Sequence, residues 1–354
     1  MIAPTQGLAA PRVPPAFRIA PYTAASIPEA TALARSPSGT LYVTTQRGVV
    51  RSIARPGARP RLFVRGLRDS TLGVTFLRGR VYVSDLGRVV AIPDAAGDGV
   101  PDGPARVILG GLPTGRHQND AVVSGPGGRL FLGVGSTCDA CRERHPWSGT
   151  ILSFRPDGGD VRVVARGLRN PYGLAFDAAG RLWATDEGRD EPDGVPEELN
   201  RIVPGGRYGW PDCWGRGGGR RCAGTRPATV TYEPHSAVTG LSFAAGRWGA
   251  AYRGNAFIAH WGTYRGRRHG RYVTRTRLTP RGPVVSRFVT GLDHPIATLF
   301  EPGGALLVAD YGTGRIWRVT RRALPRARPA RASWFGCGVW EPIRTATLWP
   351  CTSR

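Results

Sequence analysis

The chain contains no lysine. Its 49 basic residues are all arginine and stand against 25 acidic residues, which gives a net charge of +24 at pH 7. This bias, beside 50 glycines and 31 prolines, is typical of a GC-rich genome rather than of a surface built to bind phosphates. The arginines are scattered apart from local clusters such as residues 265–271. We therefore expect no specific nucleic-acid binding, but we do expect non-specific adhesion to acidic surfaces.

Long apolar runs are also missing. Residues 1–16 are rich in proline and include no stretch long enough for a signal peptide or a membrane span. The sequence thus predicts a flexible lead-in over residues 1–16 and no transmembrane segment.

The few cysteines occur as close neighbours in the sequence. The three pairs are Cys138 with Cys141, Cys213 with Cys222, and Cys337 with Cys351. An even number at short spacing favours disulfides formed in an oxidising compartment, so we expect a periplasmic or extracellular location, although no signal peptide is visible. Zinc binding is the alternative for the first pair, but no second CxxC and no HxxxH motif accompanies it.

A repeated pattern runs through most of the chain. In each unit a glycine-containing turn leads into an apolar run that ends in Asp, Thr, Ser or His, and a second strand of basic and aliphatic residues follows. The units begin at Ser36, Phe76, Gly125, Phe176, Tyr252 and Phe300.

Six such units predict an all-β chain folded as a six-bladed β-propeller, because their spacing of roughly 40 to 75 residues suits propeller blades with loop insertions. A β-sandwich or two small β domains is the alternative. We expect the propeller to occupy residues 17–320, and residues 321–354 to form a linker and a cysteine-containing tail.

Two long motifs resemble one known family. They are GLRNPYGLAFDAAGRLWATDEG, followed by EELNRIVPGGRYGWP, from residue 167 onward, and RHQNDAVVSGPGGRLFLGVGS from residue 116. Both resemble the glucose/sorbosone dehydrogenase family of sugar dehydrogenases that depend on pyrroloquinoline quinone (PQQ), and the resemblance extends over residues 17–320. The insertion at residues 136–152 and HSAVTGLSF at residues 235–243 resemble the sorbosone-dehydrogenase-like branch.

The resemblance implies a six-bladed propeller with PQQ and Ca²⁺ at the top of the central channel. By motif position, His117 matches the general base that removes the hydroxyl proton while hydride passes to the quinone. Histidine suits this task because its ordinary pKa lies near neutral pH. The alternative is a histidine that merely caps a blade turn.

The same resemblance assigns the cofactor contacts. Arg169 and Asn170 match the pair that holds PQQ, and a guanidinium offers paired donors to carboxylates. Arg169 could instead bridge to an acidic neighbour such as Asp186. Gly188 and Arg189 match the positions whose main-chain carbonyls bind the catalytic Ca²⁺, which would polarise the quinone carbonyl.

A neighbouring group of residues is expected to be structural. It consists of Glu197, Glu198, Asn200 and Tyr208.

The sequence departs from the family pattern at several positions. Ser136 stands where glucose-type members carry an aspartate that orients the base, and a hydroxyl holds an imidazole tautomer without stabilising the imidazolium. With no lysine available, His260, Trp261 or Arg265 would have to replace the lysine that contacts the cofactor from blade five. His294 is the nearest polar replacement for the missing arginines before the last blade. The lost positive charge should weaken binding of a tri-anion.

These motifs predict an oxidoreductase that oxidises a small-molecule sugar, an aldose or a sugar aldehyde such as sorbosone, and passes electrons to an external acceptor. The alternative is a non-catalytic β-propeller that binds carbohydrate or a protein partner. A lactonase would need channel carboxylates that hold a metal, and the order of Asp85, Asp186 and Asp310 at strand ends does not suggest such a site.

Overall fold

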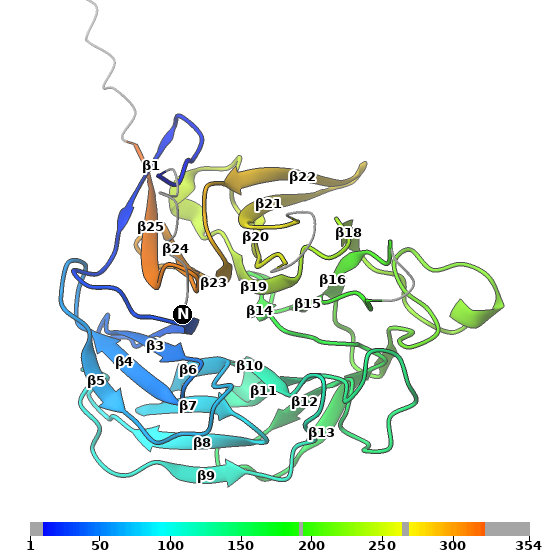
Figure 1. Ribbon diagram of the computed structural model, residues 1–354, viewed down its shortest axis with the longest axis horizontal. Coiled ribbons are helices and arrows are strands. Elements are labelled where there is room, and N and C mark those ends of the chain that lie inside the picture. The colour runs from blue at the N-terminus through cyan, green and yellow to red at the C-terminus, as the bar shows by residue number, and fades with distance from the viewer. Residues whose placement is uncertain (1–9, 191–193, 264–268, 323–354) are drawn as a thin grey trace, which may run out of the picture. The chain divides into compact units, whose positions relative to one another are not determined.

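The computed structural model describes residues 10–190, 194–263 and 269–322. In these residues, strands account for nearly all regular structure, and the helical elements are three single 3₁₀ turns at Pro126–Gly128, Arg220–Cys222 and Gly246–Trp248. The strands form six sheets arranged around a ring (Figure 1). The prediction of an all-β, six-bladed β-propeller is therefore confirmed.

The first three blades are antiparallel sheets built from consecutive strands. Blade 1 contains β2 (Ala30–Arg35), β3 (Leu41–Thr45), β4 (Val49–Ile53) and β5 (Arg61–Val64). Blade 2 contains β6 (Gly73–Leu77), β7 (Arg80–Asp85), β8 (Arg88–Pro93) and β9 (Arg106–Leu109). Blade 3 contains β10 (Asn119–Ser124), β11 (Leu130–Val134), β12 (Thr150–Phe154) and β13 (Arg162–Arg166), to which β17 (Gly206–Arg207) adds a short parallel pairing.

The last three blades follow the same plan, except that blade 4 skips β17 and blade 6 takes its outer strand from the start of the propeller. Blade 4 contains β14 (Leu174–Phe176), β15 (Leu182–Asp186), β16 (Glu197–Arg201) and β18 (Val230–Tyr232). Blade 5 contains β19 (Val238–Phe243), β20 (Ala256–His260), β21 (Tyr272–Thr279) and β22 (Gly282–Val289). Blade 6 contains β23 (Pro295–Phe300), β24 (Ala305–Asp310), β25 (Arg315–Arg321) and, as its outer strand, β1 (Phe17–Pro21) from the other end of the propeller.

Strand β1 closes the ring. Its five residues pair antiparallel with Trp317–Arg321 of β25, so the first and last parts of the propeller share one sheet (Figure 1). The repeat pattern did not reveal this strand, because the first unit that it detects starts at Ser36. Part of the predicted flexible lead-in is also anchored, since the backbone of Arg12 exchanges two hydrogen bonds of 2.8 and 3.0 Å with Thr290. Residues 1–9 lie outside the described part.

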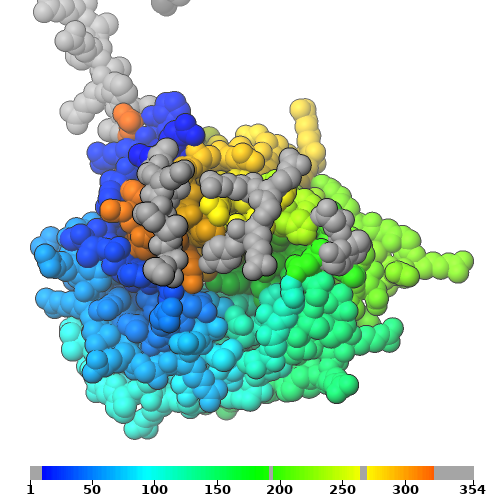
Figure 2. Space-filling view, in the orientation of Figure 1, coloured from blue at the N-terminus to red at the C-terminus, as the bar shows by residue number. Residues whose placement is uncertain are grey.

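Apolar side chains pack between neighbouring blades, which stand side by side around the ring (Figure 2). The six innermost strands line a central channel that holds a cavity of about 470 Å³. Leu72, Tyr172 and Ile296, from three different blades, belong to one buried cluster at this channel.

In three blades, an aspartate at the end of the second strand accepts hydrogen bonds from backbone N–H groups of a neighbouring loop. The carboxylate of Asp85 accepts the backbone N–H of Arg68 at 2.9 Å. Asp186 accepts the N–H groups of Arg169 and Asn170 at 3.0 and 2.7 Å. Asp310 accepts those of Asp293 and His294 at 3.2 and 2.8 Å. These carboxylates thus hold the loops that enter the innermost strands.

Two of the predicted disulfides are present, Cys138–Cys141 and Cys213–Cys222. The zinc alternative for the first pair is wrong here because its two sulfur atoms are bonded to each other. Cys337 and Cys351 lie outside the described residues. No helix in the described part of the chain is long and apolar enough to cross a membrane.

The closing strand gives a stability prediction. Phe17 is 1% exposed, and its ring lies 4.6 Å from that of Trp248 and 5.0 Å from that of Phe288. Phe17→Ala should lower the free energy of unfolding by about 3–5 kcal/mol, because it removes a buried ring at the closure of the propeller. Urea unfolding followed by fluorescence measures this change. Leu62→Ala, at a side chain that is 46% exposed, is the matched control, with an expected change within about 0.5 kcal/mol. Equal effects of both changes would contradict this account of the closure.

Candidate active site

The predicted site residues lie in loops that enter innermost strands. His117 precedes β10, Arg169 and Asn170 precede β14, and His294 precedes β23. Because the blades repeat one topology, these loops gather at the same end of the channel. The propeller therefore brings together residues that are far apart in the sequence.

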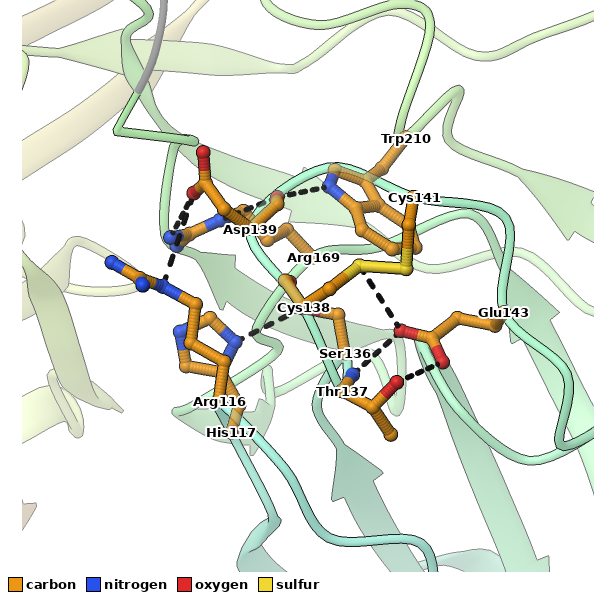
Figure 3. Close-up of a disulfide and its surroundings, with 10 residues drawn as sticks. All are labelled: Arg116, His117, Ser136, Thr137, Cys138, Asp139, Cys141, Glu143, Arg169 and Trp210. Atoms are coloured by element: carbon orange, nitrogen blue, oxygen red, sulfur yellow. Dashed lines mark hydrogen bonds and ion pairs between the residues drawn. A yellow bond between two sulfur atoms is a disulfide. The ribbon is translucent and has the colours of Figure 1, made fainter.

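His117 is paired with Ser136. Its Nδ1 lies 3.0 Å from Ser136 Oγ, and its backbone N–H donates to the Ser136 carbonyl at 3.0 Å (Figure 3). The single proton of Ser136 Oγ is donated to the carbonyl of Cys138 at 2.7 Å, so Ser136 must accept a hydrogen bond from Nδ1–H. This assigns the proton of His117 to Nδ1 and leaves the lone pair of Nε2 available as a base.

The imidazole of His117 is held neutral. Burial lowers its pKa from 6.5 to about 3, and the positive charges of Arg169 and Arg116 add to the effect. The carboxylate of Asp139 raises the pKa by less. Near neutral pH, His117 is therefore a neutral imidazole close to two guanidinium groups.

Arg169 is held by the loop that the Cys138–Cys141 disulfide closes. Its Nη2 donates to Asp139 Oδ1 at 2.8 Å and its Nε donates to the Asp139 carbonyl at 3.2 Å (Figure 3). Nη2 also lies 3.3 Å from Asp190 Oδ1, and the side chain is only 4% exposed. Arg116 forms an ion pair with the same Asp190. The side-chain bridge from Arg169 to Asp186 that the sequence suggested is wrong, because Asp186 accepts backbone N–H groups while Asp139 and Asp190 bind the guanidinium.

Asn170 lies against the same glycine as His117 and forms a hydrogen bond with the next loop. Its Nδ2 donates to Glu187 Oε2 at 3.0 Å, while its buried Oδ1 has no hydrogen-bond partner among the described residues. Gly135 lies against both side chains, and a Cβ at this glycine would collide with His117 and with Asn170 Oδ1. His117 and Asn170 therefore flank the same point of the backbone.

The loop of Gly188 and Arg189 continues from Glu187. The N–H of Gly188 donates to Glu197 Oε2 at 3.2 Å. In the part of the chain that the structure describes, neither carbonyl accepts a hydrogen bond. The Arg189 side chain donates to the Pro211 carbonyl at 3.3 Å and lies over Trp214 at 5.3 Å. Within the described residues both main-chain oxygens lack a protein donor, and oxygen is the ligand that a hard cation prefers.

The EELN segment, residues 197–200, holds neighbouring loops in place, as expected from the sequence. Glu197 accepts the N–H groups of Gly188 and Ala237, and Glu198 accepts from Gly215 and from Asn200 Nδ2. Burial is the main cause that raises the pKa of Glu197 to about 8, and the charge of Glu187 adds to it.

His294 and His260, which were expected to replace missing cations, differ in their surroundings. His294 Nδ1 lies 3.1 Å from Asp293 Oδ1, and its ring lies 4.4 Å from that of Trp261. Burial and the charge of Arg271 lower the pKa of His294. His294 thus lies in a loop at the site end of the channel, held by Asp310.

His260 requires a correction. It is fully buried, with Nδ1 2.9 Å from Ser236 Oγ and Nε2 3.0 Å from Thr274 Oγ1, and its ring packs against Tyr232 and Tyr272. Both ring nitrogens are engaged inside blade 5, so His260 is not placed to bind a cofactor. Of the two other suggested substitutes, Trp261 has its ring 4.4 Å from that of His294, and Arg265 lies outside the described residues.

Sequence reasoning missed three polar groups near the channel. Asp120 is 1% exposed, and neither of its carboxylate oxygens has a partner in the described residues. Burial raises its pKa well above the ordinary value, and the charge of Glu187 adds to this. The charges of Asp120 and Glu187 in turn raise the pKa of Tyr172, in addition to the larger effect of burial. Asp120 stands inside the HQND motif, three residues after His117, which is the signal that could have identified it.

The donor set fits PQQ with Ca²⁺ in part. The unpartnered Asn170 Oδ1, the unprotonated Nε2 of His117 and the two available carbonyls suit a ligand with a bound cation. Arg116 and Arg169 supply positive charge near His117, and Arg271 supplies it near His294. Asp139 and Asp190 already pair with Arg116 and Arg169, so little of that positive charge is left to balance a tri-anion.

Comparisons with known proteins bear on the same region. The model of the family described as glucose/sorbosone dehydrogenase matches residues 105–265. The family resemblance predicted from the sequence is thereby confirmed, and the match includes His117, Ser136, Arg169, Asn170, Gly188 and Arg189.

A curated relative agrees with that match. Quinoprotein glucose dehydrogenase B of Acinetobacter calcoaceticus is 28% identical over 144 residues, and the alignment covers 30% of this chain and 29% of that protein. The chain thus spans less than a third of this relative's length.

Solved structures cover nearly the whole propeller. A putative oxidoreductase (glucose dehydrogenase) from Thermus thermophilus has a TM-score of 0.69 and 23% identity, and covers 86% of this chain and 99% of its own. The PQQ-bound aldose sugar dehydrogenase of Streptomyces coelicolor has a TM-score of 0.68 and 22% identity, with 88% and 100% covered. The holo PQQ domain of pyranose dehydrogenase from Coprinopsis cinerea has a TM-score of 0.74 and 17% identity, with 90% and 98% covered. At these identities the likeness shows the fold.

The state of His117 is open to direct measurement. Because burial lowers its pKa to about 3, the folded imidazole should stay neutral from pH 8 to pH 5, with the proton on Nδ1. Below an unfolded pKa of about 6.5, the unfolded chain binds a proton that the folded chain does not, so stability should fall as the pH drops through this range. Nitrogen-15 NMR of labelled imidazoles, with His117→Asn to assign the signal, tests the charge and the tautomer, and urea unfolding of both proteins at pH 7 and pH 5 tests the change in stability. A His117 signal that titrates near pH 6.5, or that shows the proton on Nε2, would contradict the assignment.

Proposed function

We propose that this chain is a PQQ- and Ca²⁺-dependent dehydrogenase that oxidises an aldose or a sugar aldehyde of the glucose or sorbosone type. The observation that carries the proposal is the neutral His117 with an available Nε2, which flanks Gly135 together with the unpartnered Asn170 Oδ1. The match to the family over residues 105–265 supports it.

The protein groups have separable roles in this proposal. Asn170 and the carbonyls of Gly188 and Arg189 would hold the cofactor and its calcium ion, and Arg116 supplies positive charge near His117. When bound, PQQ supplies the quinone that accepts hydride and Ca²⁺ polarises its carbonyl. His117 Nε2 accepts the hydroxyl proton of the sugar. Ser136 keeps the proton of the resting imidazole on Nδ1, so that Nε2 faces the substrate as a base.

The charges around His117 change its strength as a base. Burial is the main cause that disfavours the imidazolium of His117, and the charges of Arg169 and Arg116 add to it. An anionic ligand beside them would partly cancel their field, and the cost of holding the sugar's proton on Nε2 would fall. His117 would therefore be a stronger base with the anionic cofactor beside it than without it.

A non-catalytic propeller that binds carbohydrate or a protein partner is the second candidate. The contacts of Arg169 favour it: the guanidinium that would grip the cofactor carboxylates is already bound by Asp139 and Asp190. In that case the loop network would be a rigid surface rather than a cofactor cradle.

Titration separates the two. Purified chain is mixed with PQQ, with and without Ca²⁺, and binding is read from cofactor absorbance while dye reduction is assayed over a panel of aldoses. We expect calcium-dependent binding and sugar-dependent dye reduction. His117→Asn should lower turnover by about 10²–10⁴-fold because it removes the base, with cofactor binding retained. Absence of cofactor binding at micromolar protein would overturn the proposal, and so would full turnover by His117→Asn.

A further inference from the structure

A groove of about 710 Å³ lies beside the Cys213–Cys222 disulfide loop and is bordered by the indole of Trp210. Four arginines line it: Arg142, Arg166, Arg207 and Arg221. All four are exposed. Among the described lining residues, Asp212 is the one carboxylate. The groove is therefore strongly cationic.

These arginines are not neutralised within the protein. In residues 10–190, 194–263 and 269–322, none of the four forms an ion pair, although Arg166 donates to the Pro146 carbonyl at 3.1 Å. Other exposed arginines do find acidic neighbours, such as Arg162 with Asp160 and Arg181 with Asp177. The groove thus gathers positive charge that the fold leaves uncompensated.

Rigid elements hold these charges close together. In the parallel pairing of β13 with β17, Arg166 stands directly opposite Arg207, and like charges in that arrangement destabilise a sheet. Arg142 follows Cys141 and Arg221 precedes Cys222, so each disulfide anchors the backbone next to one further arginine that lines the groove. A multiply charged anion would remove the repulsion and use the guanidinium donors.

The groove shares a wall with the candidate active site. Gly167 and Trp210 line both the groove and the small pocket around Arg169, Glu187 and Gly188. The Trp210 indole donates to the carbonyl of Asp139, whose carboxylate binds Arg169 (Figure 3). A molecule in the groove would therefore be separated from the predicted cofactor position by one aromatic ring and one hydrogen-bonded loop.

We propose that this arginine groove is the binding site for a small, multiply charged anionic electron acceptor. The acceptor role rests on the proposed dehydrogenase function, whereas anion binding does not. Oxidation of one sugar hydroxyl to a carbonyl releases two electrons and two protons. With hexacyanoferrate(III) as the acceptor, two ions take one electron each and become hexacyanoferrate(II), and the protons pass to the solvent.

The binding arm of the test uses the protein without cofactor. Hexacyanocobaltate(III), an anion of the same charge that is not readily reduced, is titrated by calorimetry at low ionic strength, where surface charges are least screened. The variants are Arg166→Gln with Arg207→Gln, and separately Arg142→Gln with Arg221→Gln. The control is Arg80→Gln with Arg277→Gln, which removes the same charge from exposed positions elsewhere. We expect each groove variant to weaken binding by about tenfold and the control to leave it within about twofold.

The kinetic arm measures turnover with hexacyanoferrate(III) and with the cation hexaammineruthenium(III). The groove variants should lower the second-order constant for the anion by about tenfold and flatten its dependence on salt, while the control should change it by less than about twofold. The constant for the cation should not fall. Equal anion affinity in the groove and control variants would overturn the site. Anion binding that depends on the groove, with unchanged acceptor kinetics in an active enzyme, would overturn the acceptor role. An inactive enzyme whose groove still binds the anion would refute the dehydrogenase function and leave the anion site established.

Discussion

The candidate site depends on one repeated interaction, in which a carboxylate at the end of a blade's second strand accepts backbone N–H groups of the loop entering an innermost strand. Asp186 does this for Arg169 and Asn170, and Asp310 does it for His294. Burial raises the pKa of Asp186, and the two backbone donors act in the opposite direction. The loops are thereby fixed by main-chain contacts, and their side chains are left to bind other groups.

A second chain of hydrogen bonds orients the side chain of His117 and holds that of Arg169. The carbonyl of Cys138 accepts from Ser136, Ser136 accepts from His117, and Asp139 of the same loop binds Arg169. The disulfide between Cys138 and Cys141 closes the loop that supplies two of these groups. Base orientation and placement of the nearest cation are therefore properties of one short segment, which connects the His117 site to Trp210 and the arginine groove.

Much of this could be predicted from the sequence, because the relevant signals are local or periodic. The repeats predicted six blades, cysteine spacing predicted two disulfides, and motif position placed Ser136 beside His117. Pairings between distant residues could not be read in this way. Asp139 and Asp190 bind Arg169 from 30 and 21 residues away, and β1 pairs with a strand some 300 residues later. The prediction that His260 binds the cofactor was wrong. Its position in the repeat does not tell whether a side chain at the end of a strand faces the channel or, as here, the interior of its blade.

The central claim is that His117, Asn170 and the carbonyls of Gly188 and Arg189 form one site for PQQ and Ca²⁺. A crystal structure of the chain grown with both tests it most directly. The account predicts the calcium ion on the two carbonyl oxygens, the cofactor beside Asn170, and Nε2 of His117 facing the quinone with its Nδ1 still on Ser136. A cofactor bound elsewhere, or calcium absent from those carbonyls at saturating concentration, would contradict it.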